Sequence, residues 1–134
     1  MSTHAVIWLD HEQAKVFFFD KDTYGERDFH SPKHALTSHA KHNDRQRRGE
    51  SKEQKDFFEA IAKTLGGVEE ILVLGPGIAK TELLKHLHAR EPKLAERVLA
   101  VETADHPTPG QIVAHARHYF RAKDQLLGTA PLTH

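Results

Sequence analysis

Two short apolar runs at the start of the chain limit its possible folds more than any other feature of the sequence. Residues 5–9 (Ala-Val-Ile-Trp-Leu) and 14–19 (Ala-Lys-Val-Phe-Phe-Phe) are too short for helices and rich in β-branched and aromatic residues, which favour strands. Only four residues separate the runs, a connection of hairpin length. We therefore predict an antiparallel pair of strands. Their nearly continuous apolarity indicates a central position in a sheet that is covered on both faces.

The remaining sequence predicts a third strand and then alternating helices and strands. The third strand, residues 26–30, follows a turn at residues 21–25. Capping residues and apolar periodicity predict helices that start after Ser51, Gly77 and Thr108, and short apolar runs predict strands at residues 71–74 and 98–101. The resulting order β-β-β-α-β-α-β-α predicts an α/β domain, a mixed sheet with helices on both faces. It is the element order of the ribonuclease H-like architecture.

The length of 134 residues is that of one domain, and we expect residues 1–127 to form it, with a frayed tail at 128–134. The chain has no Cys, which excludes a disulfide framework, thiol catalysis and thiolate-bound zinc. No apolar run approaches the ~20 residues of a membrane span, and the N-terminus lacks a signal-peptide pattern. We expect a cytoplasmic protein without membrane contact; the sequence does not indicate its oligomeric state.

Residues 30–50 are predicted to form a mobile, His-rich basic loop, because they contain few large apolar side chains and show no regular period. Residues 33–55 carry seven Lys and Arg against three Asp and Glu, although the whole chain has a formal net charge of zero. Such a segment can bind a polyanion through phosphate contacts and counterion release. A solvated loop would have the same composition. The candidate RNA-binding residues are Lys33, Lys41, Arg45, Arg47, Arg48 and Lys52.

The sequence Gly75-Pro76-Gly77-Ile78-Ala79-Lys80 lies between a predicted buried strand and a predicted helix, in which Ile78, Leu83, Leu84 and Leu87 are expected to point inward. A Gly-rich turn at a helix N-terminus presents backbone N–H groups to an anion, and Lys80 could add a charge. The turn matches neither the P-loop nor the dinucleotide-binding fingerprint. Two interpretations stay open: a tight strand-to-helix connection, or an anion or RNA-phosphate contact by Gly75, Gly77 and Lys80.

The sequence supports a catalytic function less well than a binding function. A two-metal nuclease needs several carboxylates within about 4 Å of a metal pair. Asp10 and Asp20 follow neighbouring antiparallel strands and are expected at opposite ends of the sheet, while Glu102 and Asp105 lack an evident partner. We therefore expect no cofactor and a non-enzymatic protein. The alternatives are a protein-interaction module, or a metal-dependent nuclease or hydrolase that uses Asp10, His11 and Glu12.

The histidines give no recognisable metal site. Four of them lie in or beside the basic loop at a spacing that matches no familiar set of zinc ligands: His30, His34, His39 and His42. We expect no metal there. Four others lie on predicted helices, where we expect them to be solvated or to cap helix ends: His86, His88, His115 and His118.

Three segments resemble a known family. Residues 74–84 resemble the Gly-Pro-Gly-x-x-Lys segment of Pelota and of the central domain of archaeal and eukaryotic class-1 peptide-release factors. Residues 8–14 (Trp-Leu-Asp-His-Glu-Gln-Ala) and 105–111 (Asp-His-Pro-Thr-Pro-Gly-Gln) resemble bacterial release-factor-like "translational machinery" proteins. The resemblance covers most of the chain as one middle domain and implies the ribonuclease H-like fold of that domain.

The resemblance also has implications for function. In release factors, the loop between the third strand and the first helix carries Gly-Gly-Gln, which enters the peptidyl-transferase centre. The corresponding segment here contains Arg-Arg-Gly-Glu-Ser at residues 47–51, and Gly-Gly-Gln occurs nowhere in the chain. The resemblance therefore implies a translation-associated protein that binds the ribosome or tRNA/rRNA without hydrolysing peptidyl-tRNA.

Overall fold

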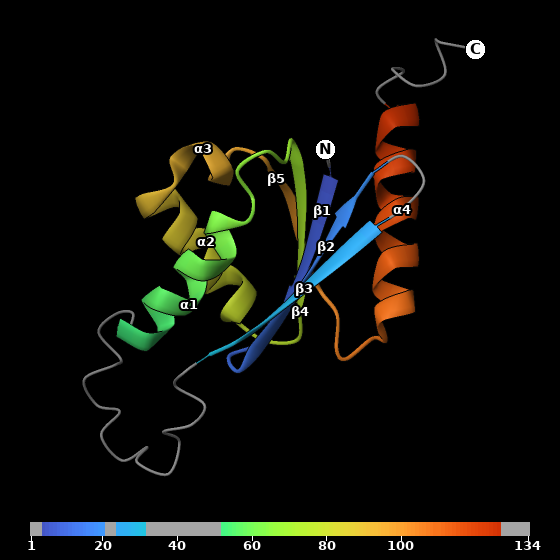
Figure 1. Cartoon of the computed structure of the whole chain (residues 1–134). Coiled ribbons are helices and arrows are strands. Elements are labelled where there is room, and N and C mark those ends of the chain that lie inside the picture. The colour runs from blue at the N-terminus through green and yellow to red at the C-terminus, as the bar shows by residue number, and fades with distance from the viewer. Residues whose placement is uncertain (1–3, 21–23, 32–51, 127–134) are drawn as a thin grey trace.

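The structure is a computed structural model and describes the backbone of residues 4–20, 24–31 and 52–126 (Figure 1). Its elements follow one another as β1 (His4–Leu9), β2 (Gln13–Phe19), β3 (Tyr24–His30), α1 (Lys52–Lys63), β4 (Glu70–Gly75), α2 (Ala79–Arg90), α3 (Pro92–Ala95), β5 (Val98–Thr103) and α4 (Pro109–Leu126). The predicted order of strands and main helices is confirmed, and the short helical piece expected around residues 92–97 is the single-turn helix α3.

The five described strands form one mixed sheet in the order β3-β2-β1-β4-β5. β1 pairs with β2, and β2 with β3, in antiparallel direction, so the predicted hairpin is confirmed. β4 lies parallel to β1 and to β5. The most apolar strands, β1 and β4, lie at the centre, because a strand buried on both faces needs apolar side chains on both.

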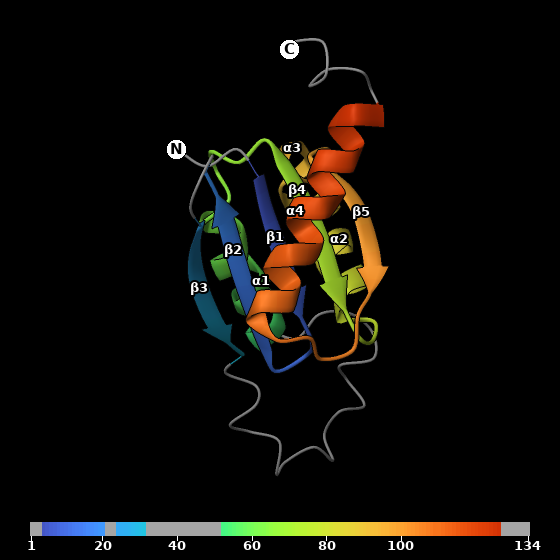
Figure 2. The same cartoon turned by 90° about the vertical axis from the view of Figure 1, so that its right-hand side faces the viewer.

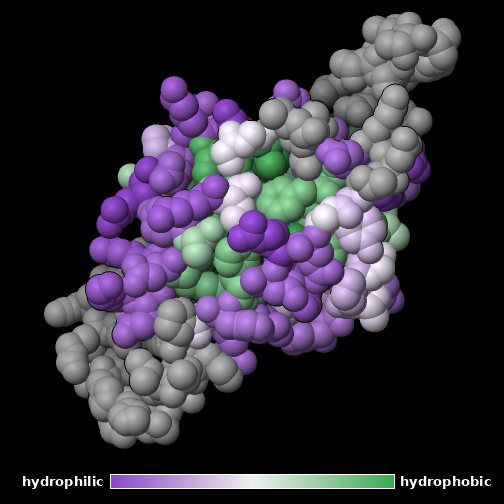
Figure 3. Space-filling model, viewed as in Figure 1, coloured by the Kyte–Doolittle hydropathy of each residue, from purple (hydrophilic) through white to green (hydrophobic). Residues whose placement is uncertain are grey.

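Helices cover both faces of this sheet, as predicted. α1, α2 and α3 lie on one face and α4 lies along the other (Figures 1 and 2). Side chains alternate between the two faces, so neighbouring residues of β1 belong to different cores: Ile7 and Leu9 pack toward α1 and α2, whereas Val6 and Trp8 pack toward α4. The sheet thus forms the central layer of three. Toward the β3 edge the surface is mainly hydrophilic, with apolar residues gathered in the middle (Figure 3).

The main differences from the predictions lie at strand ends. β3 begins at Tyr24, two residues earlier than predicted, because it pairs with β2 along the whole length of that strand, from Phe19↔Tyr24 to Gln13↔His30. His30 is the last residue of β3, as the predicted strand 26–30 has it, and it therefore does not belong to the loop that was predicted over residues 30–50. β4 and β5 also extend beyond the predicted runs, to Gly75 and Thr103.

The helices confirm the predicted apolar faces, with one exception. On α2, Leu83 and Leu87 are buried as expected and Leu84 is half-buried. Ile78 is 62% exposed, because it is the N-cap and precedes the first helical turn. The predicted capping box of α4 is present: the Thr108 N–H donates to Gln111 Oε1 (2.9 Å), and the Gln111 N–H donates to Thr108 Oγ1 (3.1 Å). None of the helices in the described part of the chain has the length and apolarity that a bilayer crossing requires.

Candidate functional site

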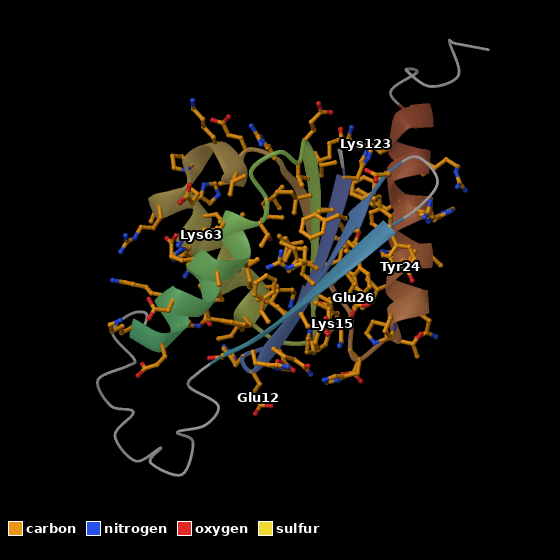
Figure 4. All side chains as sticks on the ribbon, viewed as in Figure 1. Glu12, Lys15, Tyr24, Glu26, Lys63 and Lys123 are labelled. Atoms are coloured by element: carbon orange, nitrogen blue, oxygen red, sulfur yellow. The ribbon has the colours of Figure 1, made fainter. Side chains whose placement is uncertain are left out.

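Residues 32–51, called the basic segment below, connect β3 to α1, and both described flanks of this segment lie at one end of the sheet. Five of the candidate RNA-binding residues, Lys33 to Arg48, lie outside the described residues, as do the predicted cap Ser51 and the tail 128–134. The residues on either side of the basic segment, Ser31 and Lys52, are described and show how it is attached. The Ser31 N–H donates to the Glu12 carbonyl (2.9 Å), which ties the end of β3 to the β1–β2 turn; Figure 4 shows Glu12 at this end of the sheet. Lys52, the first residue of α1, is exposed and bonds to Asp56 (3.2 Å).

A second set of contacts joins this turn to both neighbouring helices. Glu82 Oε1 accepts hydrogen bonds from His11 Nε2 (2.9 Å) and from Gln54 Nε2 (2.9 Å). His11 belongs to the β1–β2 turn, Gln54 to the first turn of α1, and Glu82 to the first turn of α2. The point where the basic segment rejoins the domain is therefore fixed against the start of α2.

The Gly75–Lys80 turn lies at the same end. A Cβ on Gly75 would collide with the backbone carbonyl oxygen of Leu9 in the adjacent strand β1, whereas a Cβ on Gly77 would meet nothing within 4 Å. Gly75 is thus required by packing, which supports the tight-connection interpretation. Among the described residues, no side chain caps α2, and the Lys80 ammonium donates to the Gly77 carbonyl. The turn therefore brings a cation and uncapped helix N–H groups to the end of the sheet where the basic segment is attached.

The acidic residues considered for a nuclease have structural partners. Asp10 Oδ1 accepts from the backbone N–H of Glu12 (2.8 Å) and of Gln13 (2.9 Å), a pattern that stabilises the β1–β2 turn. Asp10 and Asp20 follow opposite ends of the β1–β2 pair. Within the residues that the structure describes, no three His, Cys, Asp or Glu side chains are grouped so that they could hold a metal ion.

Sequence reasoning missed several histidine partners. Glu102 Oε1 accepts from His115 Nε2 (2.8 Å), and Asp105 lies 3.1 Å from His106 Nδ1, so both acids have partners. The expectation of a solvated or capping residue is wrong for His86, whose side chain is fully buried and lies 3.0 Å from Glu59 Oε2. Only the adjacent Asp105-His106 pair could have been found in the sequence, since the other partners lie on different elements.

Comparisons with known proteins agree with the fold. No family model matches the sequence. A protein pelota homologue of Thermococcus kodakarensis is 34% identical over 87 residues, which are 60% of this chain and 23% of that protein. Pelota of Archaeoglobus fulgidus has a TM-score of 0.64 at 16% identity, over 98% of this chain and 35% of its own. An archaeal translation termination factor has a TM-score of 0.51 at 14% identity, over 95% and 42% of the two chains.

These matches define a mixed α/β domain whose fold recurs in Pelota proteins and in an archaeal termination factor. With the sequence match added, the chain resembles Pelota in sequence over part of its length and in fold over most of it. It spans about a quarter of the length of the curated relative that it matches, and about a third of the Archaeoglobus chain.

Proposed function

We propose that this domain is a translation-associated, ribosome-binding protein of the cytoplasm that contacts ribosomal or transfer RNA through phosphate groups. The cations of the basic segment, Lys33, Lys41, Arg45, Arg47 and Arg48, make the main contact, and Lys52 continues it onto α1. The turn with Gly75, Gly77 and Lys80 makes a second contact. Without Gly-Gly-Gln the domain does not hydrolyse peptidyl-tRNA.

One observation carries this proposal: a local excess of positive over negative charge lies in a segment attached at one end of the sheet. Residues 32–51 carry five Lys and Arg against two Asp and Glu, a formal charge of +3, so the rest of this neutral chain carries −3. A polyanion is therefore attracted to the segment and repelled by the remainder, which orients the domain on RNA. Lys80 and Lys52 lie on the domain at the same end, within the first turns of α2 and α1.

The similarity to Pelota and to a termination factor supports the ribosome as the source of that RNA. The solved structures share too little sequence to establish more than the fold. The curated relative shares 34% of the aligned residues, which extends the resemblance to the sequence itself. Activities of the longer relatives that depend on their other regions are not proposed for this chain.

Ribosome co-sedimentation over a range of salt concentrations tests the proposal. If phosphate contacts dominate, binding falls linearly on a log–log plot against salt. Replacing Arg45, Arg47 and Arg48 together by Ala should make that slope shallower by about 2–3 units, roughly one for each lost contact.

The matched control replaces three exposed cations of α2 and α3 that follow the first turn of α2, Lys85, Arg90 and Lys93, again by Ala. It changes the net charge equally and should leave the slope unchanged. Equal effects of the two triple variants would show a general response to charge and refute the assigned contact. Absence of co-sedimentation at low salt would refute ribosome binding altogether.

A further inference from the structure

A cleft of about 420 Å³ lies between the end of β5 and the first turns of α4. The proposed function assigns no role to the residues that line it. Figure 2 shows β5 at the edge of the sheet, with the connection to α4 passing below it. Apolar side chains of Leu74, Ala104, Pro107 and Ile112 line the cleft. Its volume lies in the range of small-molecule sites, which are mainly apolar with a few polar groups.

The wall formed by the β5–α4 connection is held in place by hydrogen bonds. The Trp8 Nε1–H donates to the carbonyls of Ala104 and Asp105, each at 3.2 Å. The Ala104 N–H donates to the Gly75 carbonyl (2.9 Å), which continues the pairing of β4 with β5. The capping box at Thr108 fixes the start of α4. The cleft is therefore preformed, and little ordering is needed for a ligand to bind.

The polar groups of the cleft include both acceptors and donors. Glu102 lies opposite Leu74 in the β4–β5 register, and it therefore places a carboxylate on the sheet face that packs against α4. Its Oε1 accepts from His115, and among the described residues no hydrogen bond engages Oε2. Gln111 uses its Oε1 in the capping box, which leaves its amide N–H groups as donors. Thr103 adds a hydroxyl.

We propose that this cleft binds an unstacked guanine base of RNA, an inference that rests on the proposed function. Guanine presents two adjacent donors, N1–H and the 2-amino group, to a carboxylate such as that of Glu102, and its O6 accepts from the Gln111 amide. Leu74, Pro107 and Ile112 provide apolar contact for the ring. A Lys or Arg side chain of a protein partner offers donors only and leaves the Gln111 amide without an acceptor.

Nitrogen-15 NMR titration of the full chain with nucleoside 5′-monophosphates tests this inference. GMP should shift the backbone amides of Thr103, Ala104 and Ile112. IMP, which lacks only the 2-amino group, and AMP, which has no N1–H donor, should each bind about tenfold more weakly. Because the phosphate is common to all three, the differences report on the base.

Glu102→Gln removes the anionic acceptor with little change in shape and should weaken GMP about tenfold. The control Glu96→Gln removes an equivalent exposed carboxylate outside the cleft and should leave the affinity unchanged. The same spectra show whether each variant is folded. The inference is overturned if millimolar GMP leaves the cleft amides unshifted, if GMP, IMP and AMP bind equally, or if an Arg-containing tripeptide binds in preference to GMP.

The two proposals fail separately. Ribosome co-sedimentation that depends on Arg45, Arg47 and Arg48, without GMP binding in the cleft, would overturn the guanine site and support the proposed function. GMP binding that depends on Glu102, without co-sedimentation, would support the base site and overturn the ribosomal role.

Discussion

Replacing Gly75 by Ala should destabilise the domain, because the added Cβ atom would collide with the central strand β1. Gly75 is the last residue of β4, and the added Cβ would meet the Leu9 carbonyl oxygen of β1. Neither strand can yield easily, because β1 is also paired with β2 and β4 with β5. A clash with backbone, unlike one with a side chain, cannot be relieved by a change of rotamer.

Overpacking of a well-packed interior costs about 1–3 kcal/mol, and a backbone clash at a sheet centre should lie at the upper end. We expect Gly75→Ala to lower the free energy of unfolding by about 3 kcal/mol, which lowers Tm by roughly 10 °C in a domain of this size. Gly77→Ala is the matched control two residues away. Its Cβ meets nothing within 4 Å, so the smaller entropy of the unfolded chain should stabilise it by about 0.5 kcal/mol.

Urea unfolding followed by tryptophan fluorescence measures both effects. Trp8 is the only Trp in the chain, it is buried, and it lies opposite Leu74 in the β1–β4 register, beside the altered position. Equal stabilities of the two variants would refute the packing argument. If Gly75→Ala were as stable as Gly77→Ala but lost ribosome binding, the glycine would serve anion contact rather than the bend.

Three further variants test local features. Thr108→Ala removes the N-cap of α4 and should cost about 1 kcal/mol in urea unfolding, while equal stability would show that the cap contributes nothing. His86→Ala leaves a cavity between α1 and α2 and should lower the free energy of unfolding by about 2–3 kcal/mol. The control His88→Ala changes an exposed residue of the same helix and should alter that free energy by less than about 0.5 kcal/mol. Equal losses in the two variants would contradict the role of burial. Slight desolvation, a hydrogen bond with Asp28 and the charge of Asp28 raise the pKa of Glu26, an exposed residue of β3 that Figure 4 labels. Its contribution to stability is therefore fully present below its ordinary pKa of 4.5 and is lost as pH rises through the raised pKa. The Glu26→Gln variant should lose less stability over that pH range, and parallel pH profiles of the two proteins would contradict the shift.

Local sequence signals were sufficient to predict those elements whose structure depends on residues close together in the sequence. The hairpin of β1 and β2 follows from two apolar runs four residues apart, and the start of α4 from the Thr-Pro-Gly-Gln sequence at residues 108–111, whose cap bonds span three residues. The same reasoning failed at Ile78. An apolar pattern gives the period of a helix, but the point where the chain leaves β4 sets the first residue of α2, and that point depends on the contact of Gly75 with β1.

The sequence by itself determined the strands, the helices and the neutral chain with its basic segment, because period, capping and charge are properties of short stretches. Only the tertiary structure decided which side chains meet at the candidate sites. Glu82 receives bonds from His11 and Gln54, 71 and 28 residues away, and Glu102 meets His115 across the β5–α4 cleft. Such contacts depend on how strands order themselves in the sheet and on which face each helix covers, and no local pattern specifies either.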